Sequence, residues 1–179
     1  MNTSTGANLM MESPDLSTGT DVAVPTRSPK IARARAPRLV VLSRTECTRL
    51  LARNYVGRLA YAFRDAVDIV PLHYAYADGW IYARTSPGQK LAKLRHNRWV
   101  AFEVDEIHGR FDWSSVVVHG AVYQLDREGS PESWEQAVMA LQQKFPEAFT
   151  DQDPVPFRTM IFRIHVDAVS GRRATPTAR

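Results

Sequence analysis

Six runs of β-forming residues, separated by short connections, constrain the fold of this chain more than any other feature. The runs span residues 57–63, 67–77, 80–85, 99–107, 114–126 and 159–171. Within them, apolar residues alternate with other residues or form short continuous stretches, which is typical of strands. Most connections are too short for the crossover helix that a parallel sheet needs. The pattern therefore predicts a mainly β fold with a few short helices, arranged as a closed or nearly closed six-stranded antiparallel barrel.

Helices are expected at three places around these strands. Residues 43–54 open with Ser43 and place Glu46 three positions later, which is the capping-box pattern at the start of a helix. A second, short helix follows the third strand, and an amphipathic helix is expected at residues 130–145.

Composition divides the chain into a tail and a domain. Residues 1–37 are rich in Ser, Thr, Pro, Gly and Asn and hold few large apolar groups, so they cannot bury enough surface to offset the entropy of ordering. A disordered N-terminal tail is expected there. The folded domain is expected at residues 38–173, followed by a flexible C-terminal tail at residues 174–179.

The formal net charge of +4 is concentrated at the two ends of the chain. Residues 1–38 carry +2 and residues 172–179 carry +3, so the segment between them sums to −1. An evenly charged domain argues against a DNA-binding function. A basic tail that contacts nucleic acid or an acidic partner stays open as an alternative.

Several signals that the sequence lacks exclude further classes of protein. The sequence has no run of 18 apolar residues, and its N-terminus lacks the basic start and apolar stretch of a secretory signal. Cys47 is the only cysteine, which permits no internal disulfide. We therefore expect a cytoplasmic protein. The five histidines show no metal-ligand spacing, so no metal site is expected.

The most informative stretch joins a strand directly to the second helix. The strand ends at Arg84 and Thr85, and Ser86 is expected to cap a helix over residues 86–97. Free N–H groups at the helix start, two hydroxyls and the cations of Arg84 and Lys90 together suit a terminal phosphate dianion. The alternative is that these cations are plain surface charges. Neither GxxxxGK[ST] nor GxGxxG occurs, so nucleoside triphosphate and Rossmann dinucleotide sites find no support.

An ordered series of motifs gives a resemblance to a known family. VGRLAY, VPLHY, GQKL, AFEVDE, WSSVVVHG and SGRR follow one another between about residue 40 and residue 173. The series resembles the pyridoxamine 5′-phosphate oxidase-like family of FMN-binding split barrels, and looks most like its nitroimidazole-resistance flavoproteins. The resemblance implies a six-stranded split barrel that forms a homodimer, with FMN held between the two subunits.

The resemblance also assigns roles to particular residues. Arg84, Thr85 and Lys90 would hold the FMN phosphate, with the Ser86 hydroxyl beside them. Backbone groups along the isoalloxazine ring would come from Val70, Pro71 and Leu72, and the proline is expected to interrupt its strand. The strand that borders the cofactor would begin at Trp113, Ser114 and Ser115, and Arg172 would reach the cofactor or the partner subunit.

His73 has two possible roles. In the nitroimidazole-resistance proteins, a histidine at the matching VPxHY position lies near the flavin face. An imidazole there could donate a proton during reduction. The alternative is a histidine half-buried in a strand with a backbone partner.

The resemblance implies an FMN-dependent oxidoreductase that passes electrons from a nicotinamide donor to a small substrate, such as a nitro compound. The alternative is a non-catalytic protein of the same fold that carries or senses FMN, a deazaflavin or haem.

Overall fold

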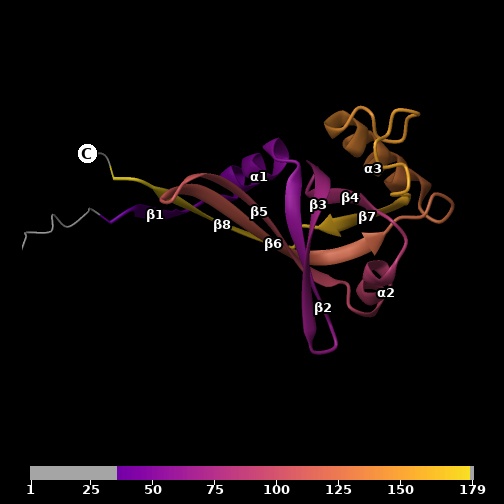
Figure 1. Ribbon diagram of the computed structural model, residues 1–179, viewed down its shortest axis with the longest axis horizontal. Coiled ribbons are helices and arrows are strands. Elements are labelled where there is room, and N and C mark those ends of the chain that lie inside the picture. Colours follow the sequence, from indigo (N-terminus) through magenta and orange to yellow (C-terminus); the bar gives the residue numbers. More distant parts are fainter. Residues whose placement is uncertain (1–35, 178–179) are drawn as a thin grey trace, which may run out of the picture. The chain divides into compact units, whose positions relative to one another are not determined.

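The computed structural model describes residues 36–177, so the tail expected at residues 1–37 lies almost wholly outside the described residues. Every strand pair in the described part of the chain is antiparallel. Six strands close into a ring (Figure 1), in the order β2 (Val56–Phe63), β3 (Ala66–Ala77), β4 (Trp80–Thr85), β7 (Met160–His165), β6 (Asp112–Gln124) and β5 (Trp99–Gly109). The predicted mainly β, six-stranded antiparallel barrel is therefore confirmed.

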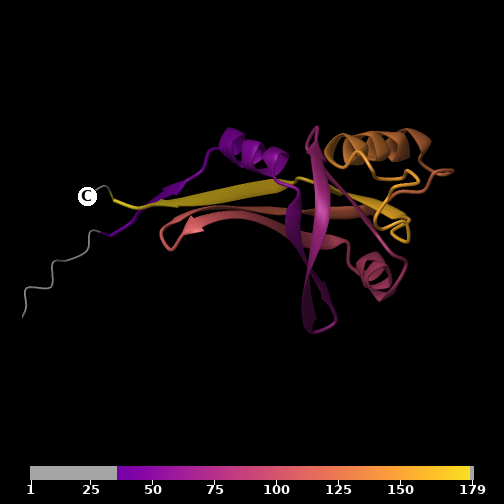
Figure 2. The ribbon, with the colours of Figure 1, turned by 45° about the horizontal axis from the view of Figure 1, so that its top comes forward.

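Two further strands extend the sheet beyond the ring. The long strand β6 pairs with β7 only through its last residues, and its first half pairs with β8 (Ala168–Thr175). Strand β1 (Arg38–Val41) pairs with the end of β8. In Figures 1 and 2, β1, β8 and the β5–β6 hairpin lie together on the opposite side of β2 and β3 from β4.

The single strand predicted at residues 159–171 was wrong, because the chain divides there into β7 and β8. Between them the chain crosses β6 at Gly120, where a Cβ atom would lie 1.8 Å from the carbonyl oxygen of His165. Only glycine allows that approach. Strand β8 then runs on to Thr175, two residues past the expected end of the domain, because β1 pairs with it there.

Pro71 does not interrupt its strand, contrary to expectation. It lies inside the continuous strand β3 and faces Arg58 of β2. On the other edge, β4 pairs with β3 only from Tyr74 to Ala77. Among the described strands, residues 66–73 of β3 therefore have an open edge, and an open edge is where a strand tolerates proline.

The helices cover the outside of the barrel. Helix α1 (Arg44–Arg53) begins with the predicted capping box, in which the Ser43 hydroxyl accepts a hydrogen bond from the Glu46 N–H. Helix α3 (Pro131–Lys144) packs on β3, β4 and β7. Both lie on one side of the sheet, whereas α2 (Gln89–His96) lies on the other (Figure 2).

Two apolar clusters hold these layers together. The larger lies inside the barrel and under α1, around Tyr74, Phe102 and Phe162. The Tyr74 hydroxyl donates a 2.7 Å hydrogen bond to the Leu51 carbonyl, and burial raises its pKa. The smaller cluster joins α3 to the outer face of β4 and β7. Within the described residues, no helix is long and apolar enough to cross a membrane.

Candidate functional site

The open edge of β3 and the end of β4 frame the candidate site. The two strands separate after the pair Tyr74–Ala83, and the chain then runs from β4 through Thr85 into α2. A cavity of about 420 Å³ lies next to this split. Its lining comes from the α1–β2 connection, β3, β4, α3 and the segment between α3 and β7: Tyr55, His73, Arg84, Leu141, Phe145, Glu147, Pro154, Val155 and Arg158.

Arg84 lines the cavity but is already paired within the chain. Its guanidinium makes a two-point contact with the Asp153 carboxylate, one bond measuring 2.8 Å. The two side chains are only 10% and 3% exposed. Asp153 also accepts hydrogen bonds from the N–H groups of Phe149 and Val155, and the guanidinium lies over the Phe149 ring at 4.9 Å.

This pairing changes the electrostatics of the Arg84 position. The Arg84 guanidinium and the two N–H donors hold the pKa of Asp153 well below its usual range. The positive charge of Arg84 is therefore balanced inside the fold. Its predicted contact with a phosphate stays a prediction.

Lys90 and Arg158 form a second cationic position, and it lacks such a balance. Lys90 is half-buried, and both burial and the nearby Arg158 lower its pKa. Between residues 36 and 177, no carboxylate lies within salt-bridge distance of either side chain. Two neighbouring cations without an anion favour an anionic ligand.

The start of α2 adds hydrogen-bond donors to this position. Ser86 is not the helix cap that the sequence predicted, because α2 begins three residues later, at Gln89, with Gly88 as its N-cap. Gly88 has no side chain to cap the first turn, so the N–H groups of Gln89 and Lys90 stay available. The buried Thr85 and the half-buried Ser86 precede them.

His73 lines the cavity with two aromatic neighbours. Its ring is exposed and stacks on Tyr55 at 6.3 Å between ring centres, and it lies 5.5 Å from Phe145. No hydrogen bond joins its ring nitrogens to another described residue. The ring is therefore open to a ligand, and the half-buried alternative does not describe it.

The other residues predicted on β3 take three different environments. Leu72 is buried in the barrel core, Val70 is half-buried against it, and Pro71 is exposed. They lie on the part of β3 with an open edge, where a ligand could bond to the backbone groups of every second residue.

The predicted residues of β6 and β8 gather in a separate hollow. Trp113, Ser115 and Arg172 line a cavity of about 260 Å³ that shares no residue with the first. Ser115 donates a 3.1 Å hydrogen bond to Glu103. Ser114 is buried and accepts a 3.1 Å hydrogen bond from Arg173. The structure thus divides the predicted site residues between two places.

Reasoning from the sequence missed most residues of the candidate site, including four that set its aromatic and charged character. Tyr55, Phe145, Asp153 and Arg158 lie in connections between elements, where neither strand nor helix periodicity applies. Asp153 and Arg158 stand 69 and 68 positions after the residues they act on, Arg84 and Lys90. The sequence offered no signal for these pairings.

The family of the chain is shown by a direct match. A family model described as pyridoxamine 5′-phosphate oxidase matches residues 43–173, from the cap of α1 into β8. The chain belongs to the pyridoxamine 5′-phosphate oxidase family. The family part of the predicted resemblance is therefore confirmed.

Similar proteins agree with this family. The crystal structure of an FAD-binding protein from Mesorhizobium loti is 36% identical to this chain and covers 78% of it and 99% of that chain, with a TM-score of 0.64. An uncharacterized protein of Rhizobium meliloti (strain 1021) is 36% identical over 85 residues, which is 48% of this chain. That match spans 56% of the relative's length.

The nitroimidazole-resistance branch is supported by fold alone. A putative 5-nitroimidazole antibiotic resistance protein from Bacteroides thetaiotaomicron is 16% identical, covers 79% of this chain and 93% of that chain, and has a TM-score of 0.60. Identity this low shows a shared fold. It does not separate this branch of the pyridoxamine 5′-phosphate oxidase family from the others.

Proposed function

We propose that this chain binds the flavin nucleotide FMN and passes electrons from a nicotinamide donor to a small substrate. The observation that carries this proposal is the Lys90–Arg158 pair at the uncapped start of α2. A half-buried pair of cations is costly without an anion, and a phosphate dianion supplies one.

The residues present fit the phosphate of a flavin nucleotide. Lys90 and Arg158 would hold its charge, and the N–H groups of Gln89 and Lys90 would donate to its oxygens. The hydroxyls of Thr85 and Ser86 precede this helix start. The FAD-binding relative from Mesorhizobium loti supports a flavin, since FAD contains the whole of FMN.

The open edge of β3 would orient the ring system. At this edge the Pro71 carbonyl is available for the polar edge of an isoalloxazine, and Val70 and Leu72 flank it. When bound, the flavin supplies the redox chemistry, accepting a hydride and releasing electrons to the substrate. His73 follows this segment directly, and one nitrogen of its exposed ring would donate a proton to the substrate.

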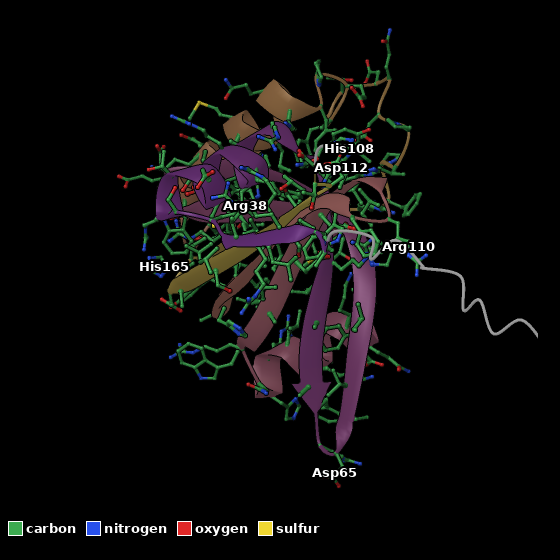
Figure 3. The ribbon with its side chains drawn as sticks, turned by 90° about the vertical axis from the view of Figure 1, so that its left-hand side faces the viewer. Arg38, Asp65, His108, Arg110, Asp112 and His165 are labelled. Atoms are coloured by element: carbon green, nitrogen blue, oxygen red, sulfur yellow. The ribbon has the colours of Figure 1, made fainter. Side chains whose placement is uncertain are left out.

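A homodimer would complete the site from the second hollow. Trp113, Ser115 and Arg172 cannot line the first cavity of their own chain, because they belong to a separate hollow on β6 and β8. Large apolar side chains are exposed on the β2–β3 hairpin, which has Asp65 at its tip (Figure 3), and on the β5–β6 hairpin. They include Val67 (69%) and Ile69 (65%) on the first and Ile107 (69%) on the second. Exposed apolar surface of this kind favours association with a second copy.

The phosphate contact is tested by comparing FMN with riboflavin, which has the same ring system and no phosphate. Riboflavin cannot make the phosphate contacts to Lys90, Arg158 and the helix start, so its affinity should be about a hundredfold lower than that of FMN. Titration calorimetry gives both dissociation constants. Equal affinities would contradict the phosphate site, and absence of binding by either compound would contradict the flavin function.

Electron transfer and assembly need separate measurements. An oxidised flavin absorbs at about 450 nm. Bleaching of this band by NADPH or NADH without oxygen would support an oxidoreductase. A bound flavin that neither nucleotide reduces would favour the non-catalytic alternative. Light scattering at micromolar concentration should give the mass of a dimer, and a monomer that binds FMN fully would contradict the shared site.

A further inference from the structure

We propose that a hollow between the end of α2 and the end of β6 binds the 2′-phosphoadenosine part of NADPH, so that NADPH rather than NADH is the electron donor. This inference rests on the proposed electron transfer and names its donor. The α2 hollow has a volume of about 290 Å³ and shares no residue with the cavity beside β3 or with the hollow on β6 and β8. A flavin held at Lys90 and Arg158 would therefore leave it unoccupied.

Two arginines are held at the α2 hollow by contacts with β6. The Val122 N–H donates a 2.9 Å hydrogen bond to the Arg98 carbonyl, which joins the α2–β5 connection to β6. The Arg95 guanidinium donates hydrogen bonds of 3.2 and 3.0 Å to the side-chain oxygen of Gln124. In Figure 1, α2 accordingly lies beside the end of β6. The backbone that carries both arginines is thus positioned before a ligand arrives.

The rest of the lining suits a flat base. Three buried apolar side chains line the hollow: Leu91, Leu94 and Val122. Tyr123 also lines it and is 40% exposed. The guanidinium carbon of Arg98 lies 5.9 Å from the centre of the Tyr123 ring and 5.7 Å from that of Trp99. Aromatic rings and planar guanidinium groups both stack on a nucleobase, so adenine would lie against Tyr123 and Arg98.

The charges of the α2 hollow favour a phosphate over a hydroxyl. Neither aspartate nor glutamate lines it, and between residues 36 and 177 no carboxylate lies within salt-bridge distance of Arg95 or Arg98. In dinucleotide sites a carboxylate binds the ribose 2′-hydroxyl of NADH, whereas an arginine accommodates the 2′-phosphate of NADPH. Two arginines without a carboxylate therefore match NADPH.

The end of helix α2 does not oppose an anion at this place. Free carbonyls at a helix C-terminus repel negative charge. Two of these carbonyls are already bonded, because the His96 ring donates from Nδ1 to the Ala92 oxygen at 2.9 Å and the Asn97 N–H donates to the Lys93 oxygen at 3.1 Å. Arg98 lies beyond the last residue of α2, so its guanidinium can hold the phosphate away from the helix end.

Helix α2 also links the hollow to the proposed flavin site. Lys90 lies in its first turn and Arg95 in its last. Between them, Lys93 makes a 2.6 Å ion pair with Asp68, on the part of β3 that has an open edge. A dinucleotide that extends along α2 from the hollow would therefore bring its nicotinamide towards the strand segment proposed to orient the isoalloxazine.

The first test uses the adenosine part alone, on the whole chain saturated with FMN. By titration calorimetry, adenosine 2′,5′-bisphosphate should bind about a hundredfold more tightly than 5′-AMP, which lacks the 2′-phosphate. In the Arg95→Ala, Arg98→Ala double variant the two compounds should bind alike. Arg110→Ala is the matched control, since this exposed arginine also lies over a neighbouring ring, that of Phe111, but does not line the hollow.

The second test measures reduction of the bound FMN. NADPH should have a KM about a hundredfold below that of NADH, and the double variant should raise the KM of NADPH to that of NADH with kcat unchanged. Equal binding of the two adenosine compounds, or a double variant that still prefers the bisphosphate, would overturn the NADPH site and leave the flavin function standing. A bound flavin that neither NADPH nor NADH reduces would overturn the electron transfer and this inference with it.

Discussion

Two cationic positions flank the same cavity, and the fold treats them differently. Arg84 has a carboxylate partner in Asp153, two further N–H donors that hold that carboxylate, and an aromatic ring beneath it. Lys90 and Arg158 have only each other among the described residues, and burial lowers the pKa of Lys90. The charge of the first position is balanced without a ligand. The charge of the second position is balanced only when an anion binds.

This difference separates structural charge from binding charge. Judged by sequence alone, Arg84 and Lys90 are equivalent, because both flank the start of one helix. In the structure, Arg84 ties β4 to the loop before β7, whereas Lys90 and Arg158 are left for a ligand. Substitutions at the two positions should therefore affect different measurements: stability for Arg84–Asp153 and affinity for Lys90–Arg158.

The largest expected effect is on stability, from Asp153→Ala. Removing one member of a buried ion pair leaves the other charge unpaired, and this costs about 3–5 kcal/mol. Urea unfolding monitored by circular dichroism measures the loss in free energy of unfolding. Asp151→Ala on the same loop is the control, since Asp151 is exposed. A loss of less than about 1 kcal/mol would place Asp153 among ordinary surface carboxylates.

The Arg84–Asp153 pair also predicts that the free energy of unfolding of the wild type falls at acidic pH. The pKa of Asp153 is lowered in the folded state from its ordinary value of 3.8, so the folded protein binds this proton less readily than the unfolded chain. The stability from this group is therefore fully present above pH 3.8 and is lost as the pH falls towards the lowered pKa. The difference between wild type and Asp153→Asn, measured by urea unfolding, should hold to pH 4 and shrink below it. A difference that already fades at about pH 6 would contradict this assignment.

A smaller effect is expected on FMN affinity at alkaline pH. The pKa of Lys90 lies below its ordinary value of 10.5, so the free protein loses this charge earlier than a surface lysine does. Phosphate needs the charged form, so FMN affinity should fall as the pH rises through that lowered pKa, by up to about tenfold per pH unit. The Lys90→Arg variant should flatten this dependence, and riboflavin should not show it. An equal alkaline loss in Lys90→Arg would assign the effect to another group.

The smallest effect is expected on stability from Lys90→Met. Charge repulsion from Arg158 and burial both disfavour the Lys90 ammonium in the folded state. Methionine keeps the length of the side chain without the charge, so the free energy of unfolding should stay unchanged or rise by less than about 1 kcal/mol. Urea unfolding without ligand tests this. A loss as large as that of Asp153→Ala would show that Lys90, too, is a structural charge.

The fold was more accessible from the sequence than the site. Period-two runs and the Ser43–Glu46 capping box are local signals, and they predicted the ring and helix α1 correctly. The break between β7 and β8 escaped prediction because it depends on the crossing at Gly120, a contact between distant segments. Pro71 was expected to interrupt β3. The strand tolerates it because β4 pairs with β3 only from Tyr74 onward, which leaves the edge beside Pro71 open.

The site depends even more on distant contacts. Local spacing brought Arg84, Thr85, Ser86 and Lys90 to one strand–helix junction, which the structure places beside the cavity. It could not show that Asp153 forms an ion pair with Arg84 or that Arg158 lies near Lys90, because Asp153 and Arg158 come from a loop almost 70 positions later. Loops carry no periodicity from which such pairings could be predicted.

The central claim is that Lys90 and Arg158 form the phosphate site, and one measurement tests it most directly. FMN affinity is measured by titration calorimetry for the Lys90→Ala, Arg158→Ala double variant and for Arg127→Ala, an exposed arginine between β6 and α3. The double variant should lose about a hundredfold in FMN affinity, keep its riboflavin affinity and stay folded, while Arg127→Ala should match the wild type. A folded double variant that binds FMN as tightly as the wild type would contradict the claim.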